Sequence, residues 1–296
     1  MIHKRQLDGL NQEELLALYG EVGKRIDNST LASLEENKSR GIHPDELMDE
    51  VIELDKNPDK MYGIPTGIGP VDDLIKGLAP GDLIILAAET GRGKSMLAQN
   101  IFHNFGCRNI PTLLVSLEMS NRQALKRYVD MDKSVHDGEN YERIRNMPLY
   151  LYEGRPTTED IEQTIIELKK EKGLQAVTID HLHYFARSEE NSSGEIGHLV
   201  REFKLMARRN NIPIILISHL RKLKKPNSMP TMNDLRDSSF TSQDADVVIM
   251  MKRDILSDNP AERATLHFEV QKSRNIGQLG KGRLQITRDY KLKEMA

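Results

Sequence analysis

The stretch Asp82–Ser95, DLIILAAETGRGKS, decides the fold. A run of apolar, β-favouring residues ends in a glycine-bearing turn, and the amphipathic run MLAQNIFHNFG follows Ser95. This order predicts a strand, a loop that cradles phosphate, and a helix. The backbone N–H groups of such a loop point at phosphate oxygens, which glycine permits because it carries no Cβ. The N-terminus of the helix adds the positive end of its dipole.

The motif assigns roles within this loop. Lys94 is expected to reach the β- and γ-phosphates, and the Ser95 hydroxyl is expected to bind Mg²⁺. The usual pattern GxxxxGK[ST] has Gly where this sequence has Ala88, so a glycine-rich turn with a surface lysine is the alternative. The preferred interpretation is a nucleoside triphosphatase. Its predicted nucleotide contacts are Glu89, Thr90, Gly91, Arg92, Gly93, Lys94, Ser95 and Met96.

Length and composition limit the class of protein. The 296 residues can form one large α/β domain with an appendage. Because the net charge is −3, any surface that binds nucleic acid must be local. The single Cys107 excludes an internal disulfide and a cysteine-rich zinc module. We see neither a signal peptide nor a run of membrane-spanning length, and we therefore expect a cytoplasmic protein.

Residues 1–60 differ in pattern from the rest and are predicted to form a helical appendage, followed by a main domain at 61–296. Asn11 and Glu14 make a capping box before an apolar helical stripe, and Pro44 opens a second helix, PDELMDEVIELDK. The segment is too short for a core of its own. It either packs on its own domain or reaches a neighbouring subunit, and the sequence leaves both open.

After residue 80, strand-like apolar runs alternate with helical patterns at 95–105, 121–132, 158–172 and 195–210. The strand candidates are LIILAA, TLLVSLE, LYLYE, QAVTID, PIILIS, DVVIMM, TLHFEV and GRLQIT. Near-continuous apolar strands with helical crossovers indicate an α/β fold, a mostly parallel twisted sheet flanked by helices. The last three strands lack intervening helices and could form an antiparallel extension.

Polar residues end three of the predicted strands, where an open α/β sheet has its ligand crevice. Asp180 is expected to hold Mg²⁺ through water, with a turn-capping aspartate as the alternative. Glu118 could polarise the attacking water as a general base, although many strands end in Glu. Ser218 and His219 end a third strand, where a polar side chain could sense the γ-phosphate.

Basic residues follow several of these strands. The most basic short loop follows His219 and either is solvated or contacts a phosphodiester backbone. Its cations are Arg221, Lys222, Lys224 and Lys225. A second loop, ARSEENSSGE, has Arg187 as its only cation. Lys272 and Arg274 lie beyond TLHFEV, outside the nucleotide crevice, and either are solvated or act on a neighbouring subunit's γ-phosphate.

Taken together, residues 60–290 resemble the RecA-type motor domain of replicative DNA helicases of the DnaB type. The stretch that leads into the phosphate loop is similar to that of the family, which often has alanine at the position of Ala88. SLEM at 116–119 matches the family segment that carries the catalytic base, here Glu118. IDHL at 179–182 corresponds to the segment that carries the metal-linked aspartate, here Asp180. The resemblance implies a RecA-like P-loop core.

The most specific match is DLRDSSFTSQDADVVIMMKRD at 234–254, which is similar to the family's DLR-S-x-x-QDAD-x-V signature near the DNA channel. By this resemblance Asn233 and Arg236 join the basic loops as DNA contacts. The family's K-x-R-N element fits residues 272–275 and implies that Arg274 is an arginine finger with Lys272 as its partner. His219 stands where bacterial members usually carry Gln and where phage relatives can have His, which suggests a phage-like origin.

The resemblance implies a ring-forming helicase that couples ATP hydrolysis to translocation on single-stranded DNA and to unwinding. The implied cofactors are ATP, or another nucleoside triphosphate, and Mg²⁺. The implied partners are single-stranded or forked DNA, further copies in a hexameric ring, and a primase or helicase loader. The family's N-terminal collar domain is missing, and the segment before residue 60 resembles its linker helix. The alternatives are a RecA- or clock-type ATPase or recombinase, and a non-unwinding loader or regulator.

Overall fold

The computed structural model describes residues 43–57, 61–133, 140–185, 193–220, 228–235, 243–275 and 278–295. The chain divides into two compact units, Met1–Pro58 and Asp59–Ala296. In the first unit, helix α3 (Asp45–Lys56) begins directly after Pro44, which confirms the helix predicted there. The capping box predicted at Asn11 and Glu14 lies outside the described residues.

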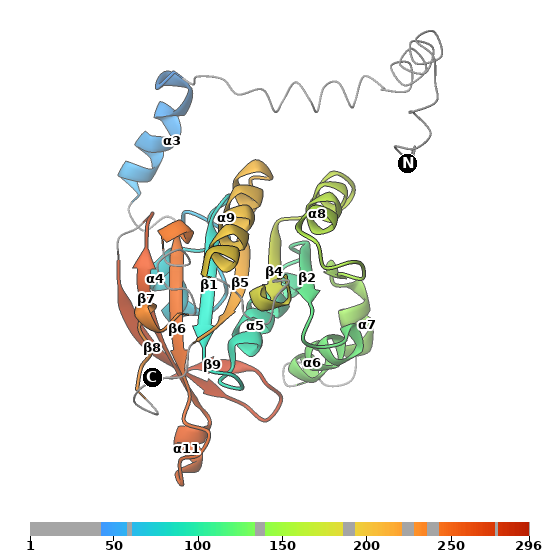
Figure 1. Cartoon of the computed structure of the whole chain (residues 1–296), viewed down its shortest axis with the longest axis vertical. Helices are drawn as coiled ribbons and strands as arrows, with labels where there is room; N and C mark the ends of the chain where they lie inside the picture. Colours follow the sequence, from blue (N-terminus) through green and yellow to red (C-terminus); the bar gives the residue numbers. More distant parts are fainter. Residues whose placement is uncertain are drawn as a thin grey trace. The chain divides into compact units, whose positions relative to one another are not determined.

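The second unit is built on a nine-stranded sheet with the order β3-β2-β4-β5-β1-β6-β7-β8-β9 (Figure 1). The strands are β1 (Leu83–Ala88), β2 (Thr112–Ser116), β3 (Leu149–Leu151), β4 (Ala176–Asp180), β5 (Ile214–His219), β6 (Val247–Lys252), β7 (Thr265–Ser273), β8 (Gly280–Ile286) and β9 (Leu292–Glu294). All eight predicted strands are confirmed, and β9 is an addition. The six strands from β3 to β6 in this order are parallel, and β7, β8 and β9 add an antiparallel extension.

This unit also contains helices before and between its strands. They are α4 (Gly69–Ile75), α5 (Lys94–Cys107), α6 (Asn121–Lys133), α7 (Asn140–Asn146), α8 (Thr158–Lys172), α9 (Ser193–Arg209) and α11 (Pro260–Arg263), with the 3₁₀ turns η2 (Leu182–Phe185) and η3 (Met232–Asp234). The four predicted helices correspond to α5, α6, α8 and α9. Helix α4 arises in a Gly- and Pro-rich stretch, where Pro70 favours a helix start. Across the described parts of the chain, no helix combines the length and apolar character needed to cross a membrane.

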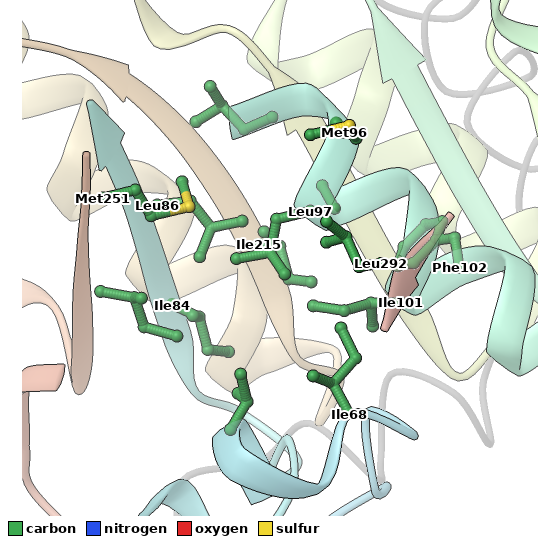
Figure 2. Packing of buried hydrophobic residues seen from close by; sticks show 14 of the residues in the cluster. Ile68, Ile84, Leu86, Met96, Leu97, Ile101, Phe102, Ile215, Met251 and Leu292 are labelled. Atoms are coloured by element: carbon green, nitrogen blue, oxygen red, sulfur yellow. The ribbon is translucent and has the colours of Figure 1, made fainter. Parts of the chain in front are cut away.

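The side chains of β1 alternate between two apolar layers, as the period of a strand requires. Ile84 and Leu86 belong to the layer that includes residues of α4, α5 and α6. Leu83 and Ile85 belong to the layer that includes residues of α8 and α9. Figure 2 shows part of the first layer, in which Ile215 of β5 lies between the labelled side chains of β1 and Ile101 of α5. Both faces of the sheet are therefore covered, and β1 is buried at every residue.

The last strand returns to the start of this unit. Leu292 N donates to Asn100 Oδ1 at 2.9 Å, and Asn100 Nδ2 donates to the carbonyl oxygen of Tyr290 at 2.8 Å. Gly69 N donates to Glu294 Oε1 at 2.8 Å. The two bonds of Asn100 fix the turn and the start of β9 against α5, the helix that follows the phosphate loop, and the bond of Gly69 joins the end of β9 to α4.

Candidate functional site

The loop predicted to hold phosphate connects β1 to α5. Gly91 has a φ of 74° and Gly93 a φ of 105°, values in the left-handed region that favours glycine. A Cβ atom on Gly93 would lie 3.2 Å from Met96 Cε, which is tighter than ordinary contact. Strand β1 lies between the parallel strands β5 and β6, so the loop opens at the C-terminal edge of the sheet.

Lys94 is buried, and the main chain of its own loop holds its ammonium group. Nζ donates to the carbonyl oxygens of Ala88 at 3.0 Å and Glu89 at 3.1 Å, and it lies 3.4 Å from His219 Nδ1. Burial lowers the pKa of Lys94 to about 8, against the opposing effect of Asp180 and other carboxylates. The hydrogen-bond acceptors are neutral, so an anionic phosphate oxygen would be a stronger partner for this group.

Asp180 ends β4 and is buried at the sheet edge beside the loop. Burial raises the pKa of its carboxyl, whereas a hydrogen bond with the Ser95 hydroxyl and the charge of Lys94 lower it. Its Oδ1 atom is buried and has no hydrogen-bond partner among the described residues. Because hard cations prefer oxygen ligands, an unsatisfied carboxylate oxygen beside a hydroxyl fits Mg²⁺ or a water bound to it.

Glu118 lies beyond the end of β2 on the wall of the same site. The predicted strand extends to Glu118, but β2 ends two residues earlier because Ser116 turns the chain. The Ser116 hydroxyl donates to Met119 O at 2.9 Å and accepts from Met119 N at 3.3 Å. Glu118 is consequently exposed on a turn, a position from which a carboxylate can contact water.

Three histidines gather where β4 and β5 end. His219 Nδ1 lies 3.3 Å from Thr90 Oγ1, and the ring of His181 meets the His219 ring edge-on with 4.2 Å between centroids. The His183 ring lies 5.6 Å from that of His219. Burial lowers the pKa of His181 to about 4, so this imidazole is neutral at pH 7. The sequence predicts a role for His219 only, because the motif that contains His181 assigns its function to Asp180.

The site forms a pocket with a volume of about 230 Å³. Its lining includes most of the predicted residues, namely Thr90, Gly91, Gly93, Lys94, Ser95, Met96, Glu118 and His219. The predicted contacts Glu89 and Arg92 are not on its wall and instead pair with each other, with 3.3 Å between Oε2 and Nη2. Arg92 Nη1 also donates to Arg253 O at 2.7 Å. This bond ties the loop to the end of β6.

Sequence reasoning missed three lining residues with distinct chemistry: Arg127, Arg253 and Tyr290. The guanidinium carbon of Arg127 lies 5.7 Å from the centroid of the Tyr290 ring. Tyr290 belongs to the turn between β8 and β9, far along the chain from the loop. Only the fold brings these side chains together, so no local pattern could have revealed them.

Two groups of described residues have the spacing of metal ligands. Glu118, His181 and His219 form one, and the other comprises His103, Cys107 and Asp132. In the second group cations already contact the ligand atoms: Lys291 Nζ lies 2.8 Å from His103 Nδ1, and Arg143 Nε donates to Asp132 Oδ2 at 3.3 Å. The buried members of that group, His103 and Asp132, therefore belong to a polar network that joins α5 and α6 to α7 and to the residues before β9.

Lys272 and Arg274 lie at the opposite edge of the sheet from the pocket. Strand β7 pairs Ser273 with Val247, which in turn pairs with Ile84 near the start of β1. The six residues of β1 separate this edge from the phosphate loop by roughly 20 Å. Arg274 therefore cannot reach the pocket of the same chain.

Asn233 is the predicted DNA contact that falls within the described residues. It is exposed on η3, where a capping box joins Thr231 and Asp234. Met232 N donates to Gln271 Oε1 on β7 at 3.0 Å, which anchors this turn to the sheet. The other predicted DNA contacts lie outside the described residues: Arg187, Arg221, Lys222, Lys224, Lys225 and Arg236.

Comparison with known sequences gives consistent matches. The family model described as the DnaB-like helicase C terminal domain matches residues 63–293. The replicative DNA helicase DnaB of Leifsonia xyli is 32% identical over 234 residues, which cover 71% of this chain and 51% of that protein. The protein of the same name from Geobacillus stearothermophilus is 29% identical over 265 residues, covering 81% and 58%. The chain thus spans about half the length of the curated relatives it matches.

Comparison with solved structures identifies the fold. One solved ATPase domain has a TM-score of 0.75 at 21% identity, and the alignment covers 87% of this chain and all of that one. A DnaB-like replicative helicase, solved to describe its interactions with primase, has a TM-score of 0.72 at 20% identity, covering 96% and 77%. At these identities the similarity shows a shared RecA-like core, as predicted.

Proposed function

Because the chain belongs to the family of DnaB-like helicase C-terminal domains, we propose that it is the motor of a ring-forming replicative DNA helicase. This motor couples ATP hydrolysis to translocation on single-stranded DNA and to duplex unwinding. One observation carries the proposal: the nucleotide pocket and Arg274 lie at opposite edges of one sheet. A complete site then requires two copies joined head to tail, and such heterologous contacts generate rings.

The phosphate loop holds the triphosphate. Lys94 leaves its main-chain acceptors for the β- and γ-phosphate oxygens, and the loop N–H groups bind the remaining oxygens. Ser95 and Asp180 would hold Mg²⁺, which would supply positive charge beside the phosphates. The buried, unsatisfied Oδ1 of Asp180 supports this assignment.

Glu118 acts as the general base. Its carboxylate lines the pocket and is exposed, so it can accept a proton from the water that attacks the γ-phosphate. Lys272 and Arg274 of the neighbouring subunit stabilise the charge of the transition state. Hydrolysis would therefore depend on assembly.

His219 links the nucleotide to DNA. It contacts Thr90 and Lys94 of the phosphate loop, and it lies at the end of β5 directly before the basic loop. A change at the γ-phosphate would reach the cations of that loop through His219. We assign DNA binding to the basic loop, to Arg187 and to the Asn233–Arg236 region.

The assembly that fits this division of the site is a hexameric ring. Helix α3 fits such an assembly, because it carries four large apolar side chains that a single helix cannot bury by itself: Leu47, Met48, Val51 and Ile52. We assign α3 as the linker that docks on a neighbouring copy. The chain's proposed partners are forked DNA and a primase or helicase loader. Its proposed location is the cytoplasm of a bacterium, and a phage that infects the bacterium is one proposed source of the gene.

A forked-DNA unwinding assay with ATP tests the proposal. We expect the native protein to unwind the fork and Lys94→Ala to be inactive. Arg274→Ala should bind nucleotide normally yet lose about 1,000-fold in DNA-stimulated hydrolysis, the usual contribution of an arginine finger. Particle imaging of the same sample should show closed rings.

Each alternative has its own outcome. Filaments that exchange strands without unwinding would indicate a recombinase on this fold. Hydrolysis that single-stranded DNA does not stimulate would indicate a loader or regulator. Normal turnover by Arg274→Ala would show that Arg274 is not part of the catalytic site. Of the proposed site, the nucleotide pocket alone would then remain supported.

A further inference from the structure

Asp246 is a buried carboxylate that lies between the start of β1 and Arg274. It immediately precedes β6 and is 3% exposed. Its Oδ2 atom accepts from Leu83 N at 2.8 Å and also from Lys204 Nζ. Its Oδ1 atom accepts from Arg274 Nη1 at 3.0 Å. One side chain thus joins β1, helix α9 and the residues that follow β7.

The main chain holds the same group of residues together. Asp246 N donates to Leu83 O at 2.9 Å, and Arg274 N donates to Asp246 O at 2.8 Å. The carbonyl oxygen of Gln243 accepts from Arg274 Nη2 at 2.9 Å and from Lys272 Nζ at 3.0 Å. The guanidinium of Arg274 is therefore fixed at two nitrogens, while 51% of its side chain remains exposed to solvent.

Asp246 lies among several charged groups, one of which is Lys272. Asp82 and Asp246 are two carboxylates in a cluster with the cations Lys204 and Arg274. Asp82 accepts a hydrogen bond from Asn275 Nδ2 at 2.6 Å, whereas Asp246 bonds Arg274 itself. Loss of the Asp246 carboxylate would therefore remove one of the two bonds that orient the guanidinium.

We propose that Asp246 is a positioning residue for the arginine that each subunit offers to its neighbour, an inference that rests on the function proposed for Arg274. Asp246 fixes the guanidinium relative to the first residue of β1, and β1 carries the phosphate loop at its other end. Because β1 is buried and paired on both edges, it joins the two half-sites rigidly. Asp246 thereby couples a subunit's own pocket to the arginine that serves the next pocket.

The variant Asp246→Asn tests this role. It keeps an oxygen that can accept from Leu83 N, but it loses the charge that binds Arg274. We expect kcat for DNA-stimulated hydrolysis to fall about 10- to 100-fold, as misplacement of a catalytic group does, while the Kd for a fluorescent ATP analogue does not change. Asp82→Asn is the matched control, because it neutralises a buried carboxylate of the same cluster that does not bond Arg274. We expect it to keep kcat.

A mixing experiment separates positioning from folding. Asp246→Asn subunits have intact pockets, and Lys94→Ala subunits have intact arginines, so mixed rings contain interfaces with both parts. An active interface needs the pocket of an Asp246→Asn subunit and the arginine of a Lys94→Ala subunit. If the two variants are mixed equally and take their places in the ring at random, about a quarter of the interfaces should be active. Subunits that merely fail to fold would gain nothing from the mixture.

The outcomes distinguish this inference from the function on which it rests. A normal kcat in Arg274→Ala would overturn the proposed function. A defective Arg274→Ala together with a normal kcat in folded Asp246→Asn would overturn the positioning role alone, as would failure of the mixture to regain activity. If Asp246→Asn does not fold, Asp246→Glu keeps the charge and moves the carboxylate by one methylene. A normal kcat in that variant would equally overturn the role.

Discussion

Asp82 is a buried carboxylate whose ionised form is disfavoured by the fold. Burial and the charge of Asp246 raise the pKa of Asp82 to about 6, against the opposing effects of Lys204 and Arg274. An aspartate in an unfolded chain has a pKa of about 3.9, so the folded state binds this proton more tightly. The stability that this proton provides is fully present below about pH 4 and is lost as pH rises through 6.

Asp82→Asn should therefore change how stability depends on pH. The variant should exceed the native protein by about 1–3 kcal/mol at pH 7, and the two should converge near pH 4. Denaturant unfolding of both proteins at several pH values measures this difference in stability. Other titrating groups, such as His103, are present in both proteins, so their contributions cancel in the difference. A difference that is the same at pH 4 and pH 7 would show that Asp82 does not titrate in this window.

Strands with strong local patterns are predictable from the sequence. The apolar runs of β1, β4 and β5 are buried on both faces, so their composition alone identifies them. The residues at their C-terminal ends meet because parallel strands share one edge. This rule brings Asp180 and His219 beside the phosphate loop without any knowledge of distances.

Elements that depend on distant contacts are not predictable in this way. Strand β9 has three residues, and its backbone is held by Asn100 of α5 rather than by a pattern of its own. Asn100 also holds the main chain of Tyr290, which lines the pocket. The bonds of Asp246 to Leu83 and Arg274 likewise join residues far apart in the chain.

Asn100→Ala tests how β9 is anchored. Asn100 is 1% exposed, and its side chain bonds both Leu292 and Tyr290, so its removal leaves buried groups unpaired. We expect a loss of about 1–3 kcal/mol in the free energy of unfolding. We also expect a higher Kd for nucleotide, because Tyr290 is no longer held at the pocket. Equilibrium unfolding and nucleotide titration measure the two effects.

The exposed Asn146 supplies the control for this prediction. Asn146→Ala lies at the end of α7 and should change stability by less than about 0.5 kcal/mol. If Asn100→Ala weakened neither stability nor nucleotide binding, β9 would be held by its pairing with β8 alone.

At the scale of the whole molecule, the net charge of −3 gives no general attraction to DNA. Attraction must then come from a few local cations. Replacing Lys222, Lys224 and Lys225 together by alanine should weaken binding of single-stranded DNA and reduce its salt slope by about two, since each neutralised phosphate contributes about 0.7. Titrations at several salt concentrations measure the slope. An unchanged slope would exclude this loop as the DNA contact.

The bond between Gly69 N and Glu294 Oε1 brings together two points of the chain that are 225 positions apart. A unit in which a residue near its start contacts a residue near its end is a candidate for circular permutation, because a linker between these regions need not cross the sheet. The same closeness would let motor units be fused in tandem within one polypeptide. A gene for such a tandem fusion would then set the order of variant and native units around an assembly.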